Sequence, residues 1–183
     1  MKSRIAAAAV LFAALAGVTS GCLGDDATAT VTFKCPSRES FTGEPSNGGA
    51  SVVAVSAFME RRCGTLDCHG STFRPMRLLG RYGLRDPAQK DVTGGAATTA
   101  AELDANYAAV CSVEPEQMDK ATADVGQSAE KLLVLQKARG VEGHKGGAIV
   151  SPGTAGDDCI LGWLRGDPLS AVAPRCQAAL GGL

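Results

Sequence analysis

The stretch VSAFMERRCGTLDCHG, residues 55–70, decides the fold that we expect for this chain. Apolar residues recur through its first half at the spacing typical of a helix with one buried face. Ser51 is a favourable N-cap and Gly64 ends the pattern, so we predict a helix over residues 51–62. The residues that follow therefore lie in a turn at the end of that helix.

This turn contains Cys63 and Cys68, with four residues between them, and His69, one of the two histidines of the chain. A covalent haem site needs two thiols that add across vinyl groups and a histidine that binds the iron. The usual motif is Cys-x-x-Cys-His, so two extra residues have to loop outward here. Gly64 permits the backbone angles that such a loop requires. A haem site with a stretched spacer is therefore physically possible here, but residues 61–70 taken alone favour a disulfide loop, because their spacer differs from that of the usual haem motif.

Two other interpretations of the same turn stay open. A disulfide between Cys63 and Cys68 would close a small loop, which suits an exported protein but gives His69 no role. A zinc site would use both cysteines and His69. Adjacent cysteine and histidine side chains do not easily face one small ion in tetrahedral geometry, so zinc is the least favoured of the three.

The rest of the chain predicts further helices separated by irregular loops. Thr99 and Glu102 form a capping box that opens a helix over residues 99–113, and Pro115 opens a short helix after it. Apolar periodicity and caps predict three more helices, over residues 128–139, 157–166 and 168–180. Segments rich in glycine predict long loops over residues 70–98 and 141–153. We therefore expect an all-α fold.

The N-terminal residues 1–21 predict an export signal of the lipoprotein type. Lys2 and Arg4 precede an apolar run of about 14 residues, shorter than the roughly 20 that span a membrane. Small residues before Cys22 resemble a lipobox, so Cys22 is the expected lipidation site; cleavage nearby by an ordinary signal peptidase is the alternative. Leu23 favours the outer membrane, so we expect the chain at its periplasmic face or at the cell surface.

We predict three parts of the chain: the signal peptide, a flexible tether over residues 22–50 and one domain over residues 51–183. The tether is rich in glycine, proline, serine and asparagine, which argues against long regular structure. Cys35 is expected to pin this arm to the domain. The remainder is long enough to bury the core of one domain.

Seven cysteines make an odd count, which lipidation of Cys22 would make even. Disulfides persist in exported proteins. If Cys63 and Cys68 bind haem, two disulfides with three possible connectivities are expected among Cys35, Cys111, Cys159 and Cys176.

The composition gives no reason to expect an enzyme or a nucleic-acid-binding protein. The net charge is −1 without a basic block, and aromatic residues make up 4%, so the core has to be mostly aliphatic. A bound aromatic cofactor would supply what the core lacks. The sequence lacks Gly-x-Ser-x-Gly, a phosphate-binding glycine loop and His-Glu-x-x-His.

Three ordered blocks resemble the small cytochrome c domains of planctomycete and related bacterial surface proteins. They are residues 55–70, SAEKLLVLQKARGVEGHKGG (128–147) and CILGWLRG (159–166), and the resemblance covers roughly residues 55–166. Such domains have a helix leading into Cys…Cys-His-Gly, then a His-x-Gly-Gly loop and a Leu-x-x-Trp helix. The chain departs from them in its four-residue spacer. The lipobox-like start also resembles that of a myxobacterial lipoprotein.

The resemblance implies a cytochrome c-like helical domain with one haem c. It makes Cys63 and Cys68 the thioether positions, His69 the proximal ligand and His144 the candidate distal ligand. Met76 and Met118 are rival ligands, and a solvated loop histidine is the alternative for His144. Trp163 is expected either against the macrocycle or in the core. Four arginines are expected either at the haem propionates or in a solvated loop: Arg74, Arg77, Arg81 and Arg85.

Two hypotheses of function follow. The first is an electron-transfer lipoprotein with one haem c, held at a membrane by its lipid and serving a redox partner protein that the sequence does not identify. The second is a haem-free structural or interaction lipoprotein with a cytochrome-like helical fold, in which a Cys63–Cys68 disulfide is one of the staples.

Overall fold

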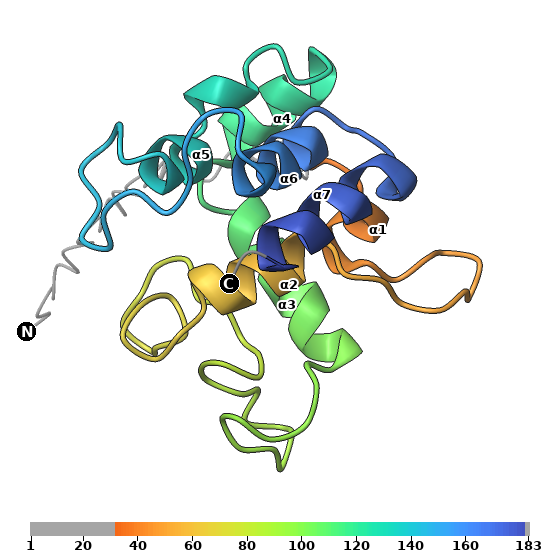
Figure 1. Ribbon diagram of the computed structural model, residues 1–183, viewed down its shortest axis with the longest axis vertical. Helices are drawn as coiled ribbons and strands as arrows, with labels where there is room; N and C mark the ends of the chain where they lie inside the picture. The colour runs from red at the N-terminus through yellow and green to blue at the C-terminus, as the bar shows by residue number, and fades with distance from the viewer. Residues whose placement is uncertain (1–31, 182–183) are drawn as a thin grey trace, which may run out of the picture. The chain divides into compact units, whose positions relative to one another are not determined.

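The computed structural model describes residues 32–181, and the predicted signal peptide and Cys22 lie outside this range. Within residues 32–181 the chain folds into seven α-helices and one 3-10 helix, without a strand (Figure 1). Two disulfides cross-link it. The prediction of an all-α, disulfide-stapled fold is therefore confirmed.

The predicted helices occur in the expected order, and α1 precedes them without having been predicted. Two of them differ most in extent. The first predicted helix begins at Val55 rather than at Ser51, and the segment 128–139 divides into a 3-10 turn and a short α-helix. In chain order the elements are α1 (Arg38–Thr42), α2 (Val55–Arg62), α3 (Ala100–Cys111), α4 (Pro115–Ala123), η1 (Ala129–Lys131), α5 (Leu133–Ala138), α6 (Ala155–Leu164) and α7 (Leu169–Gly181).

Local sequence explains where α3, α4 and α5 begin and end. Thr99 and Glu102 form the predicted capping box at the start of α3. Pro115 occupies the first turn of α4, where its missing N–H costs nothing. Gly140 follows α5 with a φ of 71°, a left-handed conformation that favours glycine and ends the helix.

The compact unit begins at Thr32, so residues 32–50 are part of the domain rather than of a tether. This segment contributes α1, whose Phe41 is fully buried and lies 4.9 Å from Trp163, measured between ring centroids. Trp163 is also fully buried, and its Nε1 donates a hydrogen bond to the Ser37 carbonyl. Trp163 is therefore a core residue, the second of the two positions expected for it, because α1 covers it.

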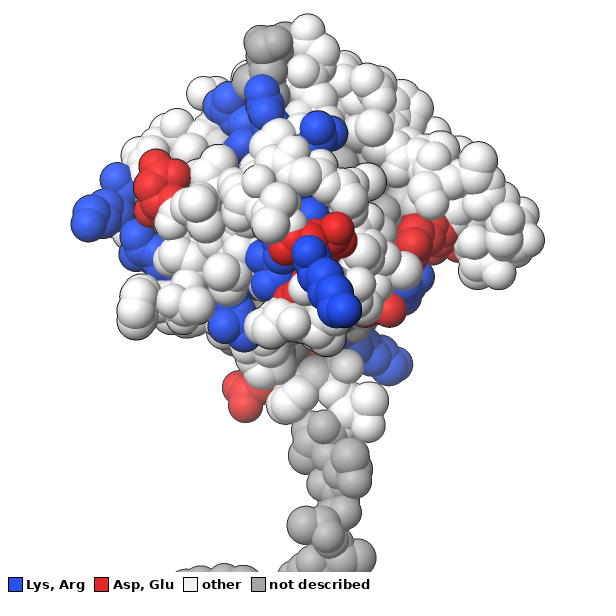
Figure 2. Space-filling model, turned by 90° about the horizontal axis from the view of Figure 1, so that it is seen from below, with Lys and Arg blue, Asp and Glu red and all other residues white. Residues whose placement is uncertain are grey.

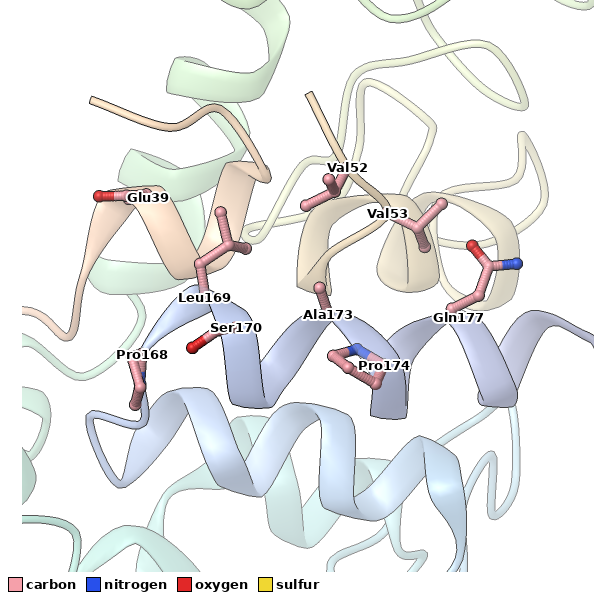
Figure 3. A pocket seen from close by; sticks show the side chains of 9 residues that line it. All are labelled: Glu39, Val52, Val53, Pro168, Leu169, Ser170, Ala173, Pro174 and Gln177. Atoms are coloured by element: carbon pink, nitrogen blue, oxygen red, sulfur yellow. The ribbon is translucent and has the colours of Figure 1, made fainter. Parts of the chain in front are cut away.

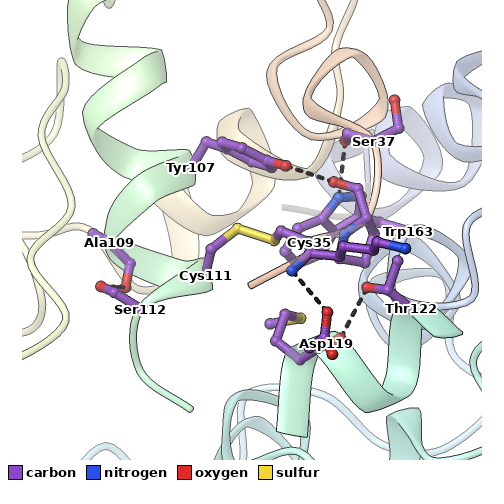
Figure 4. The surroundings of a disulfide bond; sticks show 12 residues. Cys35, Ser37, Tyr107, Ala109, Cys111, Ser112, Asp119, Thr122 and Trp163 are labelled. Atoms are coloured by element: carbon purple, nitrogen blue, oxygen red, sulfur yellow. Dashed lines mark hydrogen bonds between the residues drawn. A yellow bond between two sulfur atoms is a disulfide. The ribbon is translucent and has the colours of Figure 1, made fainter. Parts of the chain in front are cut away.

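The disulfide between Cys35 and Cys111 fixes this N-terminal arm to the end of α3 (Figure 4). Tyr107 lies on α3, one turn before Cys111, and its hydroxyl donates a hydrogen bond to the Pro36 carbonyl. The second disulfide joins Cys159 to Cys176 and so ties α6 to α7, which lie side by side in Figure 1. The four cysteines expected to form staples therefore do so, and the expectation that Cys35 pins the arm is confirmed.

The loop between α2 and α3 is organised by a buried ion pair. Arg85 donates through Nε and Nη2 to the two carboxylate oxygens of Glu102, each at 2.8 Å, and both side chains are buried. Arg85 also contacts Asp91 at 3.2 Å. The interpretations of Arg85 as a propionate partner or a solvated residue are therefore wrong, since its guanidinium is already paired inside the domain.

Charged side chains of both signs are interspersed on the face seen in Figure 2. Exposed ion pairs such as Arg38–Asp104 and Arg175–Asp167 fit this pattern. Within residues 32–181 none of the helices is long and apolar enough to cross a membrane.

Candidate functional site

The cysteine motif is a closed turn at the C-terminal end of α2. The His69 amide donates to the Cys63 carbonyl at 2.8 Å, which joins the two ends of the motif. The amides of Cys68 and Gly70 both donate to the Thr65 carbonyl at 2.9 Å. Leu66, in the middle of the spacer, is 53% exposed. The four-residue spacer therefore loops outward while the backbone at its two ends stays connected.

Three glycines allow this turn to lie directly against the following loop. A Cβ built on Gly70 would stand 2.0 Å from the Gly64 carbonyl oxygen, and one on Gly83 would stand 2.1 Å from the same oxygen. The Leu84 amide donates to the Gly70 carbonyl at 2.8 Å across this contact. Only glycine fits at these two positions, because the neighbouring atoms belong to backbone.

We expect Gly70→Ala to destabilise the domain by about 1–3 kcal/mol, because the added methyl group forces two backbone segments apart. Chemical denaturation of the purified chain measures this. Gly143→Ala is the matched control: its Cβ would meet no atom within 4 Å, so its stability should not fall below that of the wild type. Equal stability of the Gly70 and Gly143 variants would contradict the packing described above.

The thiols of Cys63 and Cys68 are free, although the other four cysteines of residues 32–181 are bridged. Burial, with a smaller contribution from the neighbouring Cys68, raises the pKa of the Cys63 thiol to about 12. The thiolate is the form that attacks disulfides and binds metals, so burial disfavours the reactive form of Cys63. The Cys63–Cys68 disulfide of the second hypothesis is not present in the structure.

His69 is held in one orientation by the loop beneath it. Its Nδ1 lies 2.7 Å from the Met76 carbonyl oxygen, which can only accept, so Nδ1 carries the proton and Nε2 keeps its lone pair. Burial lowers the pKa of His69 more than this hydrogen bond raises it. A neutral imidazole with Nδ1–H bonded to a carbonyl is the form in which histidine binds a metal through Nε2.

His144 faces His69 from the loop that follows α5. The two ring centroids are 6.0 Å apart and the ring planes differ by 18°. The Nδ1 of His144 lies 3.1 Å from the Gly147 carbonyl, so its Nε2 is also available. The two histidines of the chain therefore form a pair of nearly parallel, stacked rings.

Both histidines line a cavity of about 780 Å³. All four predicted site residues line it: Cys63, Cys68, His69 and His144. Its apolar wall comes from α2, α5, α6 and the segment before α6, through Met59, Leu133, Val134, Ile149 and Ile160. Arg74, Lys137 and Lys145 also line it, and Asp67 is the acidic residue among the lining. The site is an apolar cavity with basic side chains and two opposed imidazoles.

The remaining candidate residues, two methionines and four arginines, differ in whether they line this cavity. Met76 lines the cavity, whereas Met118 is buried in the core and does not line it. Of the four arginines, Arg74 alone lines the cavity; its Nε donates to the Cys68 carbonyl at 3.3 Å. Arg77 and Arg81 are exposed and lie outside the lining.

Sequence reasoning did not identify Lys137 or Lys145 as residues of this site. Lys145 follows His144 directly, so its position was recoverable; Lys137 lies on α5, and no motif marks it. Among residues 32–181, no three or more His, Cys, Asp and Glu side chains form a metal-binding cluster. This arrangement does not favour the zinc interpretation.

A second cavity, of about 610 Å³, lies between α7 and residues 52–53 (Figure 3). Glu39 is the one ionisable residue of its lining, and apolar side chains such as Leu169 and Ala173 form much of the remainder. Its lining contains no histidine, cysteine or basic residue. Comparisons of the chain with protein-family models, with curated proteins and with solved structures found no match.

Proposed function

We propose that the chain binds one haem c in the histidine cavity and transfers electrons. Cys63 and Cys68 would hold the haem as thioethers, His69 would be its proximal ligand and His144 its distal ligand. The observation that carries the proposal is the 6.0 Å separation of the His69 and His144 ring centroids. Two imidazoles that bind one metal ion from opposite sides, with bonds of about 2 Å, have ring centres about 6 Å apart.

The hydrogen bonds of the two imidazoles also support ligation of a metal through Nε2. Each histidine has its Nδ1 within hydrogen-bond distance of a carbonyl oxygen, that of Met76 for His69 and that of Gly147 for His144. Such partners fix the ring and direct Nε2 to the metal. The free thiols of Cys63 and Cys68 line the same cavity as the imidazoles.

The cavity also fits a large, flat, mostly apolar group that carries negative charge at one edge. Its volume lies within the range of cofactor sites, about 300–1,000 Å³. Arg74, Lys137 and Lys145 are suitable partners for carboxylates at its margin. When bound, haem supplies an iron that cycles between two oxidation states, and two histidine ligands give a lower potential than a histidine and a methionine.

The proposal includes export and attachment to a membrane by a lipid on Cys22. The two disulfides support an oxidising compartment, where such bonds persist. Cys22 itself lies outside the described residues. The redox partner would be a protein in the same compartment.

The test is the absorption spectrum of protein made in a host with haem-attachment machinery. We expect a Soret band that stays with the protein through acid–acetone extraction, since thioethers survive this treatment. In the Cys63→Ser, Cys68→Ser double variant the extracted protein should be colourless. Cys63→Ser alone should keep a covalent haem with a shifted spectrum, because one thioether remains.

A colourless wild-type protein would overturn the proposal. Thiol counting on the same sample then identifies the alternative: a protein without free thiols would be the haem-free, disulfide-stapled lipoprotein. Circular dichroism of each variant shows whether its helices are intact, so loss of colour through unfolding is recognised.

A further inference from the structure

The two opposed histidines are held very differently by the rest of the domain. His69 lies inside the closed turn, where its amide donates to Cys63 and its carbonyl accepts from the Leu78 amide, each at 2.8 Å. Its side chain donates to Met76 as well. In the proposed haem complex, covalent bonds at Cys68 and Cys63 would fix it further. His69 therefore cannot leave the cavity without disrupting the turn.

His144 lies on a loop with little anchoring. Residues 141–148 are exposed apart from His144 itself. The amides of Val141 and Glu142 anchor the start of this loop to the Gln136 carbonyl, at 3.0 and 3.4 Å. Across residues 143–148, one hydrogen bond reaches the rest of residues 32–181, from Lys137 Nζ to the Gly143 carbonyl at 3.1 Å. The bond that orients the His144 ring, to Gly147, lies within the loop and moves with it.

The loop also has space in which to move. A Cβ built on Gly143 or on Gly147 would meet no atom within 4 Å. Segments with few buried contacts and exposed backbone open at the smallest free-energy cost in a protein. The loop of residues 141–148 therefore belongs to the part of the domain that opens most easily, and the turn around His69 does not.

From this asymmetry we propose that His144 is a displaceable ligand, and that the reduced protein binds a small neutral molecule such as carbon monoxide in its place. The inference rests on the proposed function, because it requires haem in the cavity. With haem bound, His144 Nε2 would be the donor that is replaced, with its lone pair, by the carbon lone pair of carbon monoxide, and the oxidation state of the iron would not change.

The experiment is rapid mixing of reduced protein with carbon monoxide, followed at the Soret band. For the wild type we expect an observed rate that levels off as carbon monoxide rises, because departure of His144 becomes limiting. For His144→Ala the rate should rise in proportion to carbon monoxide without a plateau. The reduced spectrum of this variant before mixing should already show a changed ligand field.

Two variants, one on α5 and one on the loop, change the anchoring of the loop and leave the His144 side chain in place. Lys137→Ala removes the bond to Gly143 and should increase carbon monoxide affinity up to about fivefold, the fold-change that corresponds to one ordinary hydrogen bond. Gly143→Ala restricts the open loop and should lower the affinity by about two- to fivefold. Lys131→Ala, an exposed lysine outside the cavity, is the control and should leave it unchanged.

The outcomes separate this inference from the proposed function. The inference alone is overturned if the wild type has a Soret band but saturating carbon monoxide leaves its reduced spectrum unchanged, while the spectrum of His144→Ala responds. Identical, unsaturated rates in the wild type and His144→Ala also overturn it, since His144 would not be the ligand displaced. Absence of a Soret band overturns the proposed function, and the inference with it.

Discussion

A chain carrying His69→Ala should contain at least about tenfold less haem per polypeptide than the wild type, when both are made with haem-attachment machinery. Removing even an outer-shell partner of a metal ligand lowers metal affinity by about 10–100-fold, so loss of the proximal ligand should weaken capture of haem, before the thioethers form, by no less. His69 is also the more firmly held of the two histidines, through Met76 and Cys63. Haem absorbance per protein, after denaturation in alkaline pyridine, gives the ratio.

His144→Ala is the matched control for this prediction. It removes the other imidazole of the same cavity, yet we expect it to retain haem, because Cys63, Cys68 and His69 remain. Its spectrum should change while its haem content stays close to that of the wild type. Equal haem content and identical spectra in the wild type and His69→Ala would show that His69 is not the proximal ligand.

The second large effect is expected at Glu102, far from the proposed haem. Replacement by alanine should lower the free energy of unfolding by about 3–5 kcal/mol, the usual cost of leaving one partner of a buried ion pair uncompensated. The side chain of Glu102 is fully buried and accepts hydrogen bonds from Arg85 and from the amides of Asp86 and Thr99. Chemical denaturation at neutral pH measures the difference.

Asp104→Ala is the control, since Asp104 also lies on α3 and pairs with Arg38 at the surface. An exposed pair contributes about 0–1 kcal/mol, so this variant should be close to the wild type. Equal effects of the Glu102 and Asp104 substitutions would contradict the burial of the Arg85 pair.

The loss in free energy of unfolding caused by Glu102→Ala should also depend on pH. Burial opposes ionisation of this carboxyl, but the bonds from Arg85, Thr99 and Asp86 outweigh it and lower its pKa to about 2. An ordinary glutamate has a pKa of about 4.3 in the unfolded chain. The stabilisation is therefore fully present above that value and is lost as the pH falls towards 2. The difference between the wild type and Glu102→Ala should shrink over the same interval.

Local signals in the sequence predicted much of this fold. The capping box at Thr99, the proline at the start of α4 and the cysteines available for staples each depend on nearby residues or on simple counting. The pairing of His69 with His144 was also predictable as a hypothesis, because the chain has just two histidines and one lies in the cysteine motif. The 6.0 Å separation of the two ring centroids was not predictable, because it depends on how α5 is placed against α2.

The features that the sequence did not predict depend on tertiary contacts. The five-residue helix α1 lies in a segment rich in glycine and proline, and it is stabilised by burial of Phe41 against Trp163 rather than by helix propensity. Arg85 was expected beside haem or in solvent, because its partner Glu102 lies 17 residues away and already had a role as a cap. Periodicity does not reveal such long-range pairs.

The two disulfides also decide how the domain would respond to mechanical load. Tension between its N-terminal and C-terminal ends would pass from Cys35 directly to Cys111, and from Cys159 directly to Cys176, through covalent bonds. The chain inside these two loops is shielded, and the segment that can lengthen is residues 112–158. His69 lies in the shielded part and His144 in the extensible one. A protein tethered to a surface at one end and pulled at the other would therefore lose the contact between its two histidines before its cysteine motif came under strain.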